Sequence, residues 1–364
     1  MAASVAERER IEARLERGGL AVEFLRAPEL LFRVVSGLRR ALYDRRWIPT
    51  AKLDAPVVSI GNLSAGGTGK TPMVAWVARE LGARGRRVGL LSRGFGARAG
   101  AGNDEAALLA ELLPDVPHAQ GADRIANGHG LIERHACDVL VLDDGFQHRK
   151  LARDLDIVLL DATRPWGLAG RSDRDAPLLP RGLLREPPSA LSRADAVILT
   201  RVDQASTAEL TDLRRAVERH APGKALALAS HAPARLRALD GARAELAELS
   251  GRDVDVVSGI GNPAAFQRTL EALGARVREH RRFPDHHAFT ASDLAGLGAR
   301  WIVVTAKDAV KLRALASPAL GSLRALDIEL RFHEGQAALG ALLDSLAPSR
   351  AQRERTALHE GLHG

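Results

Sequence analysis

Hydrophobic positions after residue 50 fall into short runs that alternate with a stretch of helical periodicity. Residues 57–60 form an apolar run that ends at Gly61, residues 72–84 place apolar side chains on one helical face, and residues 87–91 form the next run. Two more apolar runs, 138–142 and 156–160, are each followed by an acidic residue. Short apolar runs are typical of buried strands. Strands alternating with helices predict a parallel α/β sheet that binds ligands at the carboxyl ends of its strands.

A second series of apolar runs follows a segment rich in Pro, Gly and Arg at 177–188, and we place a domain boundary near residue 190. The 364 residues suit two globular domains of ordinary size. Strands are expected at 196–200, 254–258 and 301–305, and the last fifteen residues, 350–364, are polar. We therefore expect a helical region at 1–50, an α/β domain at 51–190, a smaller α/β domain at 191–332, and a C-terminal helix and tail at 333–364.

Residues 20–47 have the pattern of a basic amphipathic helix, started or broken near Pro28. Leu, Val and Phe side chains recur at helical spacing, and six arginines lie between and after them. Two interpretations remain open: the apolar face packs on the core, or it lies in a membrane interface where the arginines meet anionic headgroups. The sequence has no apolar stretch long enough to span a bilayer, and residues 1–19 have no signal-peptide core.

Charge and composition narrow the classes of partner. The chain has 52 basic and 45 acidic residues, a formal charge of +7, and only six of the basic residues are lysines. Such a protein attracts polyanions: nucleic acid, anionic lipid or phosphorylated substrates. Aromatic residues make up only 4% of the chain, which disfavours single-stranded nucleic acid as a partner. The one cysteine, Cys137, excludes an internal disulfide and a cysteine-based zinc site, and fits a reducing compartment.

The strongest chemical signal is a glycine-rich loop between the first strand and its helix, with the sequence GNLSAGGTGKTP at 61–72. In such a loop the backbone N–H groups point toward phosphate oxygens and the lysine neutralises phosphate charge. The hydroxyl of the Ser or Thr after the lysine ligates Mg²⁺. The pattern departs from the strict P-loop because Ser64 stands at the first glycine position. The strand and helix context still predicts a P-loop, with binding residues Ser64, Ala65, Gly66, Gly67, Thr68, Gly69, Lys70 and Thr71.

Asp143 and Asp144 close the apolar run at 138–142. A P-loop site needs a carboxylate at the end of a nearby strand to hold Mg²⁺. We expect the metal ligands to be Thr71, Asp143 and Asp144, with one acid of the pair free to orient another group. The expected fold class is α/β, a P-loop NTPase-type parallel sheet domain joined to a smaller α/β domain and an N-terminal amphipathic helix.

Ordered motifs from about residue 20 to 345 resemble the tetraacyldisaccharide 4′-kinase (lipid A 4′-kinase) family. The motifs are the loop at 61–72, SRGFG at 92–96, DE at 104–105, DR at 123–124, DDGFQH at 143–148, LREP at 184–187, GIGNP at 259–263 and FPDHHAF at 283–289. The resemblance implies transfer of phosphate from ATP, with Mg²⁺, to the 4′-hydroxyl of the lipid A disaccharide 1-phosphate. It also implies a peripheral protein at the cytoplasmic face of the inner membrane, a C-terminal helix that returns to the first domain, and no nucleic-acid partner. We expect a monomer.

Individual site residues also carry over from the resemblance. Asp104 and His286 correspond to the pair that acts on the acceptor hydroxyl, and Lys70 and Asp144 join them as catalytic residues. Arg124 and Arg185 match positions that hold phosphate, and Glu105, Gln147 and His148 belong to the expected substrate side. A positioned base near the attacking oxygen suits phosphoryl transfer, since an imidazole polarised by a carboxylate supplies one.

One stretch departs from the family pattern. Residues 94–102, rich in Gly and Ala, form a short loop where the family usually has a longer insertion facing the substrate. Two functions of other classes compete with the kinase: a P-loop nucleotide switch acting on a protein partner, and a nucleic-acid-binding ATPase, which only the charge suggests.

Overall fold

The computed structural model describes residues 11, 13–65, 68–94, 104–260, 262–284, 287–313, 315 and 321–349, apart from the side chains of residues 21, 104 and 105. It divides into two compact units. The larger contains Leu15–Ala101, Leu109–Ser230 and Leu330–Gly364, and the smaller contains Met1–Arg14, Gly102–Leu108 and His231–Glu329.

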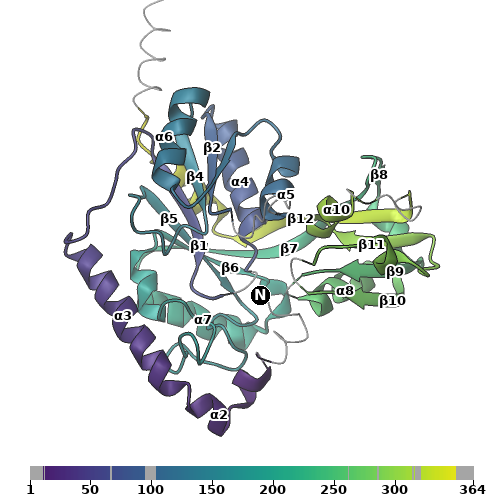
Figure 1. The fold of residues 1–364 in the computed structure, drawn as a ribbon, viewed down its shortest axis with the longest axis horizontal. Helices are drawn as coiled ribbons and strands as arrows, with labels where there is room; N and C mark the ends of the chain where they lie inside the picture. Colours follow the sequence, from purple (N-terminus) through teal and green to yellow (C-terminus); the bar gives the residue numbers. More distant parts are fainter. Residues whose placement is uncertain are drawn as a thin grey trace, which may run out of the picture. The chain divides into compact units, whose positions relative to one another are not determined.

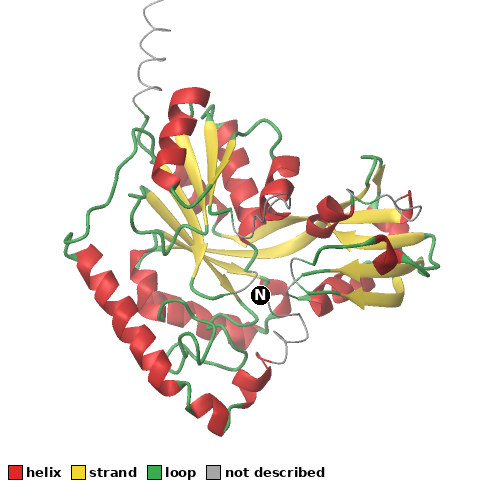
Figure 2. Ribbon diagram, in the orientation of Figure 1, coloured by secondary structure: helices red, strands yellow, loops and turns green. Residues whose placement is uncertain are grey.

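The larger unit is built on a parallel sheet with strand order β7-β6-β5-β1-β4-β2-β3 (Figures 1 and 2). The strands are β1 (Val57–Asn62), β2 (Val88–Ser92), β3 (His118–Gln120), β4 (Val139–Asp143), β5 (Leu155–Asp161), β6 (Ala196–Thr200) and the first part of β7 (Ala225–Ala238). Every residue of β1, β2, β4, β5 and β6 is buried, which explains why these strands read as continuous apolar runs.

Helices cover both faces of this sheet because successive strand residues point to opposite sides. On one face Val58 and Ile60 pack with α4 (Lys70–Ala83) and α11 (Gln336–Asp344), and on the other Val57 packs with α6 (Arg124–His135). Near β5 and β6 the second face is covered by α7 (Thr207–His220) and by the 3₁₀ helix η1 (Pro188–Arg193). α5 (Asp104–Leu112) and the 3₁₀ turn η2 (Val202–Gln204) complete the connections.

The smaller unit is also a parallel α/β sheet, with strand order β10-β9-β11-β12. Its strands are β9 (Asp253–Ser258), β10 (Arg276–Arg282), β11 (Trp301–Thr305) and β12 (Leu323–Glu334), while β8 (Arg243–Ala244) pairs antiparallel with β7. Val256 faces a cluster with Phe266 of α8 (Pro263–Ala272), and Val257 faces one with Leu312 of α10 (Ala306–Leu312). The short helices η3 (Leu246–Leu249) and α9 (Ala291–Leu294) lie in the connections.

The N-terminal amphipathic segment forms two helices, α2 (Leu20–Glu23) and α3 (Arg26–Asp44). Pro28 lies in the first turn of α3, where its missing N–H costs no helical hydrogen bond, so the proline starts this helix and does not break it. The expected membrane face of α3 is exposed. Its other face packs on the rest of the larger unit through Glu29, Phe32 and Tyr43.

The expected boundary near residue 190 is wrong. β6 and α7 belong to the larger unit, and the division falls between Ser230 and His231, within the long strand β7. The return strand β12 is divided in the same way, at Glu329 and Leu330. The Pro- and Gly-rich segment is a loop of the larger unit, whose sheet continues beyond it, so composition marked a loop and not a domain boundary.

Candidate active site

The glycine-rich loop joins β1 to α4, as the sequence predicted, although Gly66 and Gly67 lie outside the described residues. Gly69 precedes the helix with a φ of 86°, a left-handed conformation that favours glycine. Gly61 lies against the chain of Phe146, where an added Cβ would come within 2.5 Å of the Phe146 Cβ. The two glycines therefore allow the turn and its close packing on the segment after β4.

Asp143 and Asp144 close β4, the neighbour of β1, with Asp143 in register with Ile60. Asp144 has a φ of 50°, unusual for a residue other than glycine. Its carboxylate lies 3.5 Å from the Lys70 Nζ, and Arg185 Nη1 donates to its two oxygens at 2.8 and 3.0 Å. We call Asp144, Lys70, Arg185 and Arg124 the Asp144 cluster.

Arg124 joins this cluster from α6. Asp123 caps the helix by accepting from the N–H groups of Ile125 and Ala126, which fixes Arg124 in its first turn. The Arg124 side chain is buried, and its Nη1 donates to the carbonyl oxygen of Asp144 at 3.3 Å. Arg124 therefore holds the backbone of Asp144, whereas Arg185 holds its carboxylate.

The charges of the cluster shift the pKa of its members. Burial alone would raise the pKa of Asp144, but the nearby positive charges of Lys70 and Arg185 outweigh it and the pKa is lowered. Burial lowers the pKa of Arg124, and the charges of Asp144 and Asp143 oppose that effect. The carboxylate is therefore ionised at neutral pH, beside cations that an anionic phosphate would also attract.

Gln147 and His148 follow in the same segment. Gln147 donates from Nε2 to the carbonyl oxygen of Asn62 at 2.9 Å and accepts from Arg185 Nη1 at 3.4 Å. Asn62 in turn accepts from Lys70 Nζ through its side-chain oxygen at 3.4 Å. Asn62 had no predicted role, although a polar side chain at the end of β1, within the glycine-rich motif, was a signal. Burial, together with nearby cations including Arg124, lowers the pKa of His148 to about 4.

The start of the glycine-rich loop pairs with the segment that carries Arg185. Ala65 donates from its N–H to the carbonyl of Leu183, and Arg185 donates from its N–H to the carbonyl of Leu63, both at 2.7 Å. Ser64 forms an antiparallel bridge with Leu184. The Ala65 N–H is thus already hydrogen-bonded within the protein.

Other predicted residues occupy varied positions. Thr71 lies half-buried in the first turn of α4. Thr68 is buried, and its carbonyl oxygen accepts from the Thr200 hydroxyl at 3.0 Å. Thr200 ends β6 and had no predicted role, although a polar residue at a strand end was the available signal. Asp104 begins α5, in a stretch grouped with the smaller unit, but its side chain and that of Glu105 lie outside the described part of the structure, as do His286 and the loop at 95–102.

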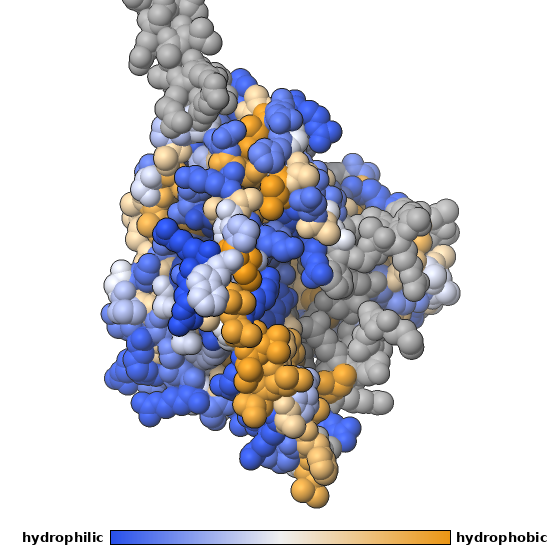
Figure 3. Space-filling view, turned by 60° about the vertical axis from the view of Figure 1, so that its left-hand side comes forward, coloured by the Kyte–Doolittle hydropathy of each residue, from blue (hydrophilic) through white to orange (hydrophobic). Residues whose placement is uncertain are grey.

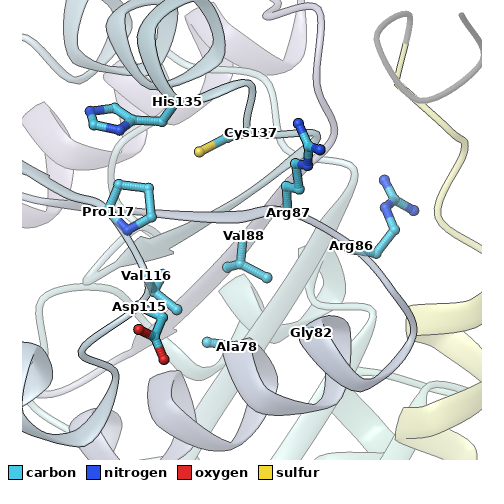
Figure 4. Close-up of a pocket in the computed structure, with 10 residues that line it drawn as sticks. All are labelled: Ala78, Gly82, Arg86, Arg87, Val88, Asp115, Val116, Pro117, His135 and Cys137. Atoms are coloured by element: carbon cyan, nitrogen blue, oxygen red, sulfur yellow. The ribbon is translucent and has the colours of Figure 1, made fainter. Parts of the chain in front are cut away.

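A cavity of about 360 Å³ opens elsewhere in the larger unit (Figure 4). Its lining includes Val88 at the start of β2, and Cys137, which precedes β4. It therefore lies at the amino ends of these strands, whereas parallel α/β proteins bind their ligands at the carboxyl ends. Burial raises the pKa of the Cys137 thiol to about 11, which makes it a poor nucleophile.

The acidic groups of the site suit a metal that is also bound by phosphate. Within the described residues, no cluster of three or more His, Cys, Asp or Glu side chains could hold a metal ion. Mg²⁺ in nucleotide sites is usually held by one or two carboxylates together with substrate phosphates and water. The donor set of Thr71, Asp143 and Asp144 fits that kind of binding.

A parallel sheet, a glycine-rich loop leading into a helix that begins with lysine and threonine, and paired acids on the adjacent strand define a protein of the P-loop nucleotide-binding class. Comparison with known proteins identifies the family. The model of the family LpxK, tetraacyldisaccharide-1-P 4′-kinase, matches residues 21–347, and this chain belongs to that family.

Relatives and a solved structure agree with this assignment. The chain is 48% identical over 353 residues to the tetraacyldisaccharide 4′-kinase of Anaeromyxobacter dehalogenans (strain 2CP-C), covering 90% of this chain and 91% of that one. It is 42% identical to the enzyme of Syntrophus aciditrophicus (strain SB), covering 83% and 87%. The crystal structure of LpxK from Aquifex aeolicus in complex with ATP has a TM-score of 0.71 at 32% identity and covers 89% of this chain and 98% of that chain.

Proposed function

We propose that this chain transfers the γ-phosphate of ATP to the 4′-hydroxyl of the tetraacyldisaccharide 1-phosphate precursor of lipid A, with the Asp144 cluster as its phosphate-transfer site. The chain's family membership supports the reaction. The observation that carries the choice of residues is the convergence of Lys70 and Arg185 on Asp144, directly beside the glycine-rich loop. The same family match favours the kinase over both rival functions, the nucleotide switch and the nucleic-acid ATPase.

Lys70 and Arg185 would receive the phosphates. Phosphoryl transfer depends on positioning and on charge stabilisation, because the transferred group carries its negative charge through the transition state. Lys70 lies in the first turn of α4, where helix N–H groups add to its charge. Arg185 presents a planar set of donors that suits phosphate oxygens. Arg124 would act through the backbone of Asp144 because its own side chain is buried.

Thr71, Asp143 and Asp144 would hold Mg²⁺. When bound, the ion neutralises phosphate charge and orients the phosphate oxygens. The lowered pKa of Asp144 keeps its carboxylate available for such binding at neutral pH. Its two cationic partners would be free to turn toward phosphate.

Asp104 and His286 would activate the acceptor hydroxyl as one unit, with the imidazole as base and the carboxylate as its partner. Their motifs support this assignment. Gln147 is tied to Asn62 and Arg185, so it would orient the groups around the phosphate, while Glu105 and His148 would complete the substrate side.

The outer face of α3 would bind the cytoplasmic surface of the inner membrane. Leu30, Leu31, Val34, Val35 and Leu38 are 57–65% exposed. Figure 3 shows hydrophobic surface gathered over this part of the molecule. None of the described helices is both long and apolar enough to cross a bilayer. An apolar stripe bordered by arginines is the pattern of a helix that lies in the lipid interface. We call these five residues the α3 outer face.

The test is transfer of ³²P from labelled ATP to purified tetraacyldisaccharide 1-phosphate, with the labelled position located at the 4′-hydroxyl by chemical degradation. We expect labelled lipid from the native chain, and loss of labelling when Mg²⁺ is chelated or Lys70 is changed to Ala. ATP hydrolysis without lipid labelling would overturn the proposed function.

A further inference from the structure

Glu29 is a buried acid on a helix whose other face is apolar and exposed. It is only 4% exposed, whereas the next residue, Leu30, is 62% exposed. Its Oε1 accepts from the backbone N–H of Leu178 at 3.0 Å and from Arg33 Nη2 at 2.9 Å, and its Oε2 accepts from Arg181. A buried carboxylate needs such partners, and two of them belong to the loop that precedes Arg185.

That loop is closed on itself. The N–H of Leu179 donates to the carbonyl of Leu184 at 2.9 Å, and the N–H of Gly182 donates to the carbonyl of Leu178 at 2.9 Å. An added Cβ on Gly182 would come within 2.2 Å of the Pro177 carbonyl oxygen, so the turn is tightly packed. A contact that holds Leu178 in place therefore also holds Leu184, at the other end of the loop.

The far end of the loop is part of the candidate site. Residues 183–185 pair with residues 63–65 at the start of the glycine-rich loop, and Arg185 reaches the carboxylate of Asp144. A short chain of hydrogen bonds thus runs from the Glu29 carboxylate, through one closed loop, to both the phosphate-binding loop and its arginine. All of these residues lie in the larger unit.

We propose that Glu29 is a positioning residue for phosphoryl transfer: its carboxylate anchors the 178–185 loop and thereby sets the position of Arg185 and of residues 63–65. The proposal rests on the proposed role of Arg185 in that reaction. Because Glu29 lies on the same helix as the α3 outer face, the helix that would meet the lipid also holds the loop that carries Arg185.

The ionised form of Glu29 is the one that this contact needs. Burial would raise the pKa of Glu29, but hydrogen bonds from Arg181, Leu178 and Arg33 outweigh it and the pKa is lowered. The carboxylate is therefore charged at neutral pH and can accept from both loop donors.

The test compares Glu29→Ala, Arg185→Ala and the double variant, with kcat measured at saturating ATP and detergent-dispersed substrate so that membrane binding is not limiting. We expect Glu29→Ala to lower kcat about tenfold, and the double variant to be within about twofold of Arg185→Ala. Glu23→Ala is the matched control, because Glu23 pairs with Arg26 and, among the described residues, forms no hydrogen bond or ion pair with the 178–185 loop. It should retain native kcat.

A purely structural effect is separated by a second control. Leu343 is buried in α11, and Leu343→Ala should lower the melting temperature without lowering kcat. If Glu29→Ala does not fold, Glu29→Gln replaces it in the same comparison, since its amide oxygen still accepts from Leu178 while the charge opposite Arg181 is lost. We then expect about a threefold loss of kcat.

Three results would overturn the proposal. The first is native kcat in a folded Glu29→Ala or Glu29→Gln variant, and the second is a fully multiplicative loss in the double variant. The third is an equal loss of kcat in Leu343→Ala at a matched drop in melting temperature. An Arg185→Ala variant with native kcat would instead refute the proposed role of Arg185, and with it the route from Glu29 to the site.

Discussion

The Asp144 cluster and the α3 outer face are two regions of the same unit with opposite chemistry. In the cluster, charged side chains are partly or fully buried and each has partners: Asp144 contacts Lys70 and Arg185, and Arg124 donates to its backbone. On the α3 outer face, large apolar side chains are more than half exposed. The first region withdraws charge from water, and the second presents apolar surface to it.

This difference shows what each region requires. Burying charges without compensation is unfavourable, so a compact set of opposed charges at the end of a strand indicates a site built to handle charge. An exposed apolar patch is also unfavourable, and it indicates a partner that covers it. The two regions differ in chemistry but are connected: Glu29 of α3 hydrogen-bonds the 178–185 loop, and that loop carries Arg185 of the Asp144 cluster.

The largest expected effect is at the charged region. Lys70→Ala should lower kcat by about 10³-fold, because the lysine's charge would stabilise the transferred phosphoryl group in the transition state, and it should leave the protein folded. Steady-state kinetics and thermal melting would measure both. Lys52→Ala removes an exposed lysine of the same unit and should keep native kcat. Near-native turnover in Lys70→Ala would remove the glycine-rich loop from the mechanism.

The acceptor side should be next in magnitude. Asp104→Ala and His286→Ala should each lower kcat by about 10²-fold, the range of a positioned base, and the double variant should lose little beyond the worse single one. The KM for ATP should change little, since the nucleotide is held around Lys70. Independent, multiplicative losses would argue against a single catalytic unit. An active Asp104→Ala variant would show that, because of the shortened loop at 94–102, Asp104 does not correspond to the catalytic acid of the family.

The apolar region should respond in membrane binding and not in chemistry. Leu31→Asp and Val35→Asp should each weaken co-sedimentation with anionic vesicles about tenfold, because burying such a side chain is worth ~1.5–3 kcal/mol. Added salt should weaken binding further, since each arginine near the surface contributes ~1 kcal/mol. Thr211→Asp on the exposed side of α7 is the control and should bind normally. Unchanged binding in both α3 variants would argue against the α3 outer face as the membrane contact.

The smallest effect is a shift along the pH profile. His148, with a pKa of about 4, is neutral above about pH 5, and the lowered pKa of Asp144 keeps that carboxylate charged there. We expect the proposed base, His286, to give an acid limb of kcat near the ordinary histidine pKa of ~6.5. His148→Asn should leave the midpoint of this limb within about 0.3 pH units, whereas His286→Asn should abolish it. A limb that moves with His148 would reassign the base.

The same shifts have a consequence for stability in acid. The pKa of Asp144 is lower in the folded protein than the unfolded value of about 3.9, so its ion pairs stabilise the fold above that pH. This contribution is lost as the pH falls through the folded value. Acid unfolding of Asp144→Asn, followed by circular dichroism, should start from a lower stability at pH 7 and show less further loss below pH 4.

Much of the fold could be read from the sequence because buried parallel strands must be apolar on both faces. The run at 196–200 corresponds residue for residue to β6, and β1, β4 and β5 differ from their predicted ends by one or two residues. β10 was missed because it is a largely exposed strand with five charged residues among seven. No apolar run marks such a strand.

The sequence alone determined the glycine-rich loop, the acid pair and the amphipathic helix, because each depends on residues close together in the chain. Only the tertiary structure decided that Arg185 meets Asp144 and that Ala65 pairs with Leu183. It also decided that Glu29 holds the 178–185 loop. These contacts join residues about 40 to 150 positions apart, and local periodicity carries no information on which distant groups meet. Burial then selects the partners, because a charge withdrawn from water needs an opposite charge or a hydrogen bond beside it.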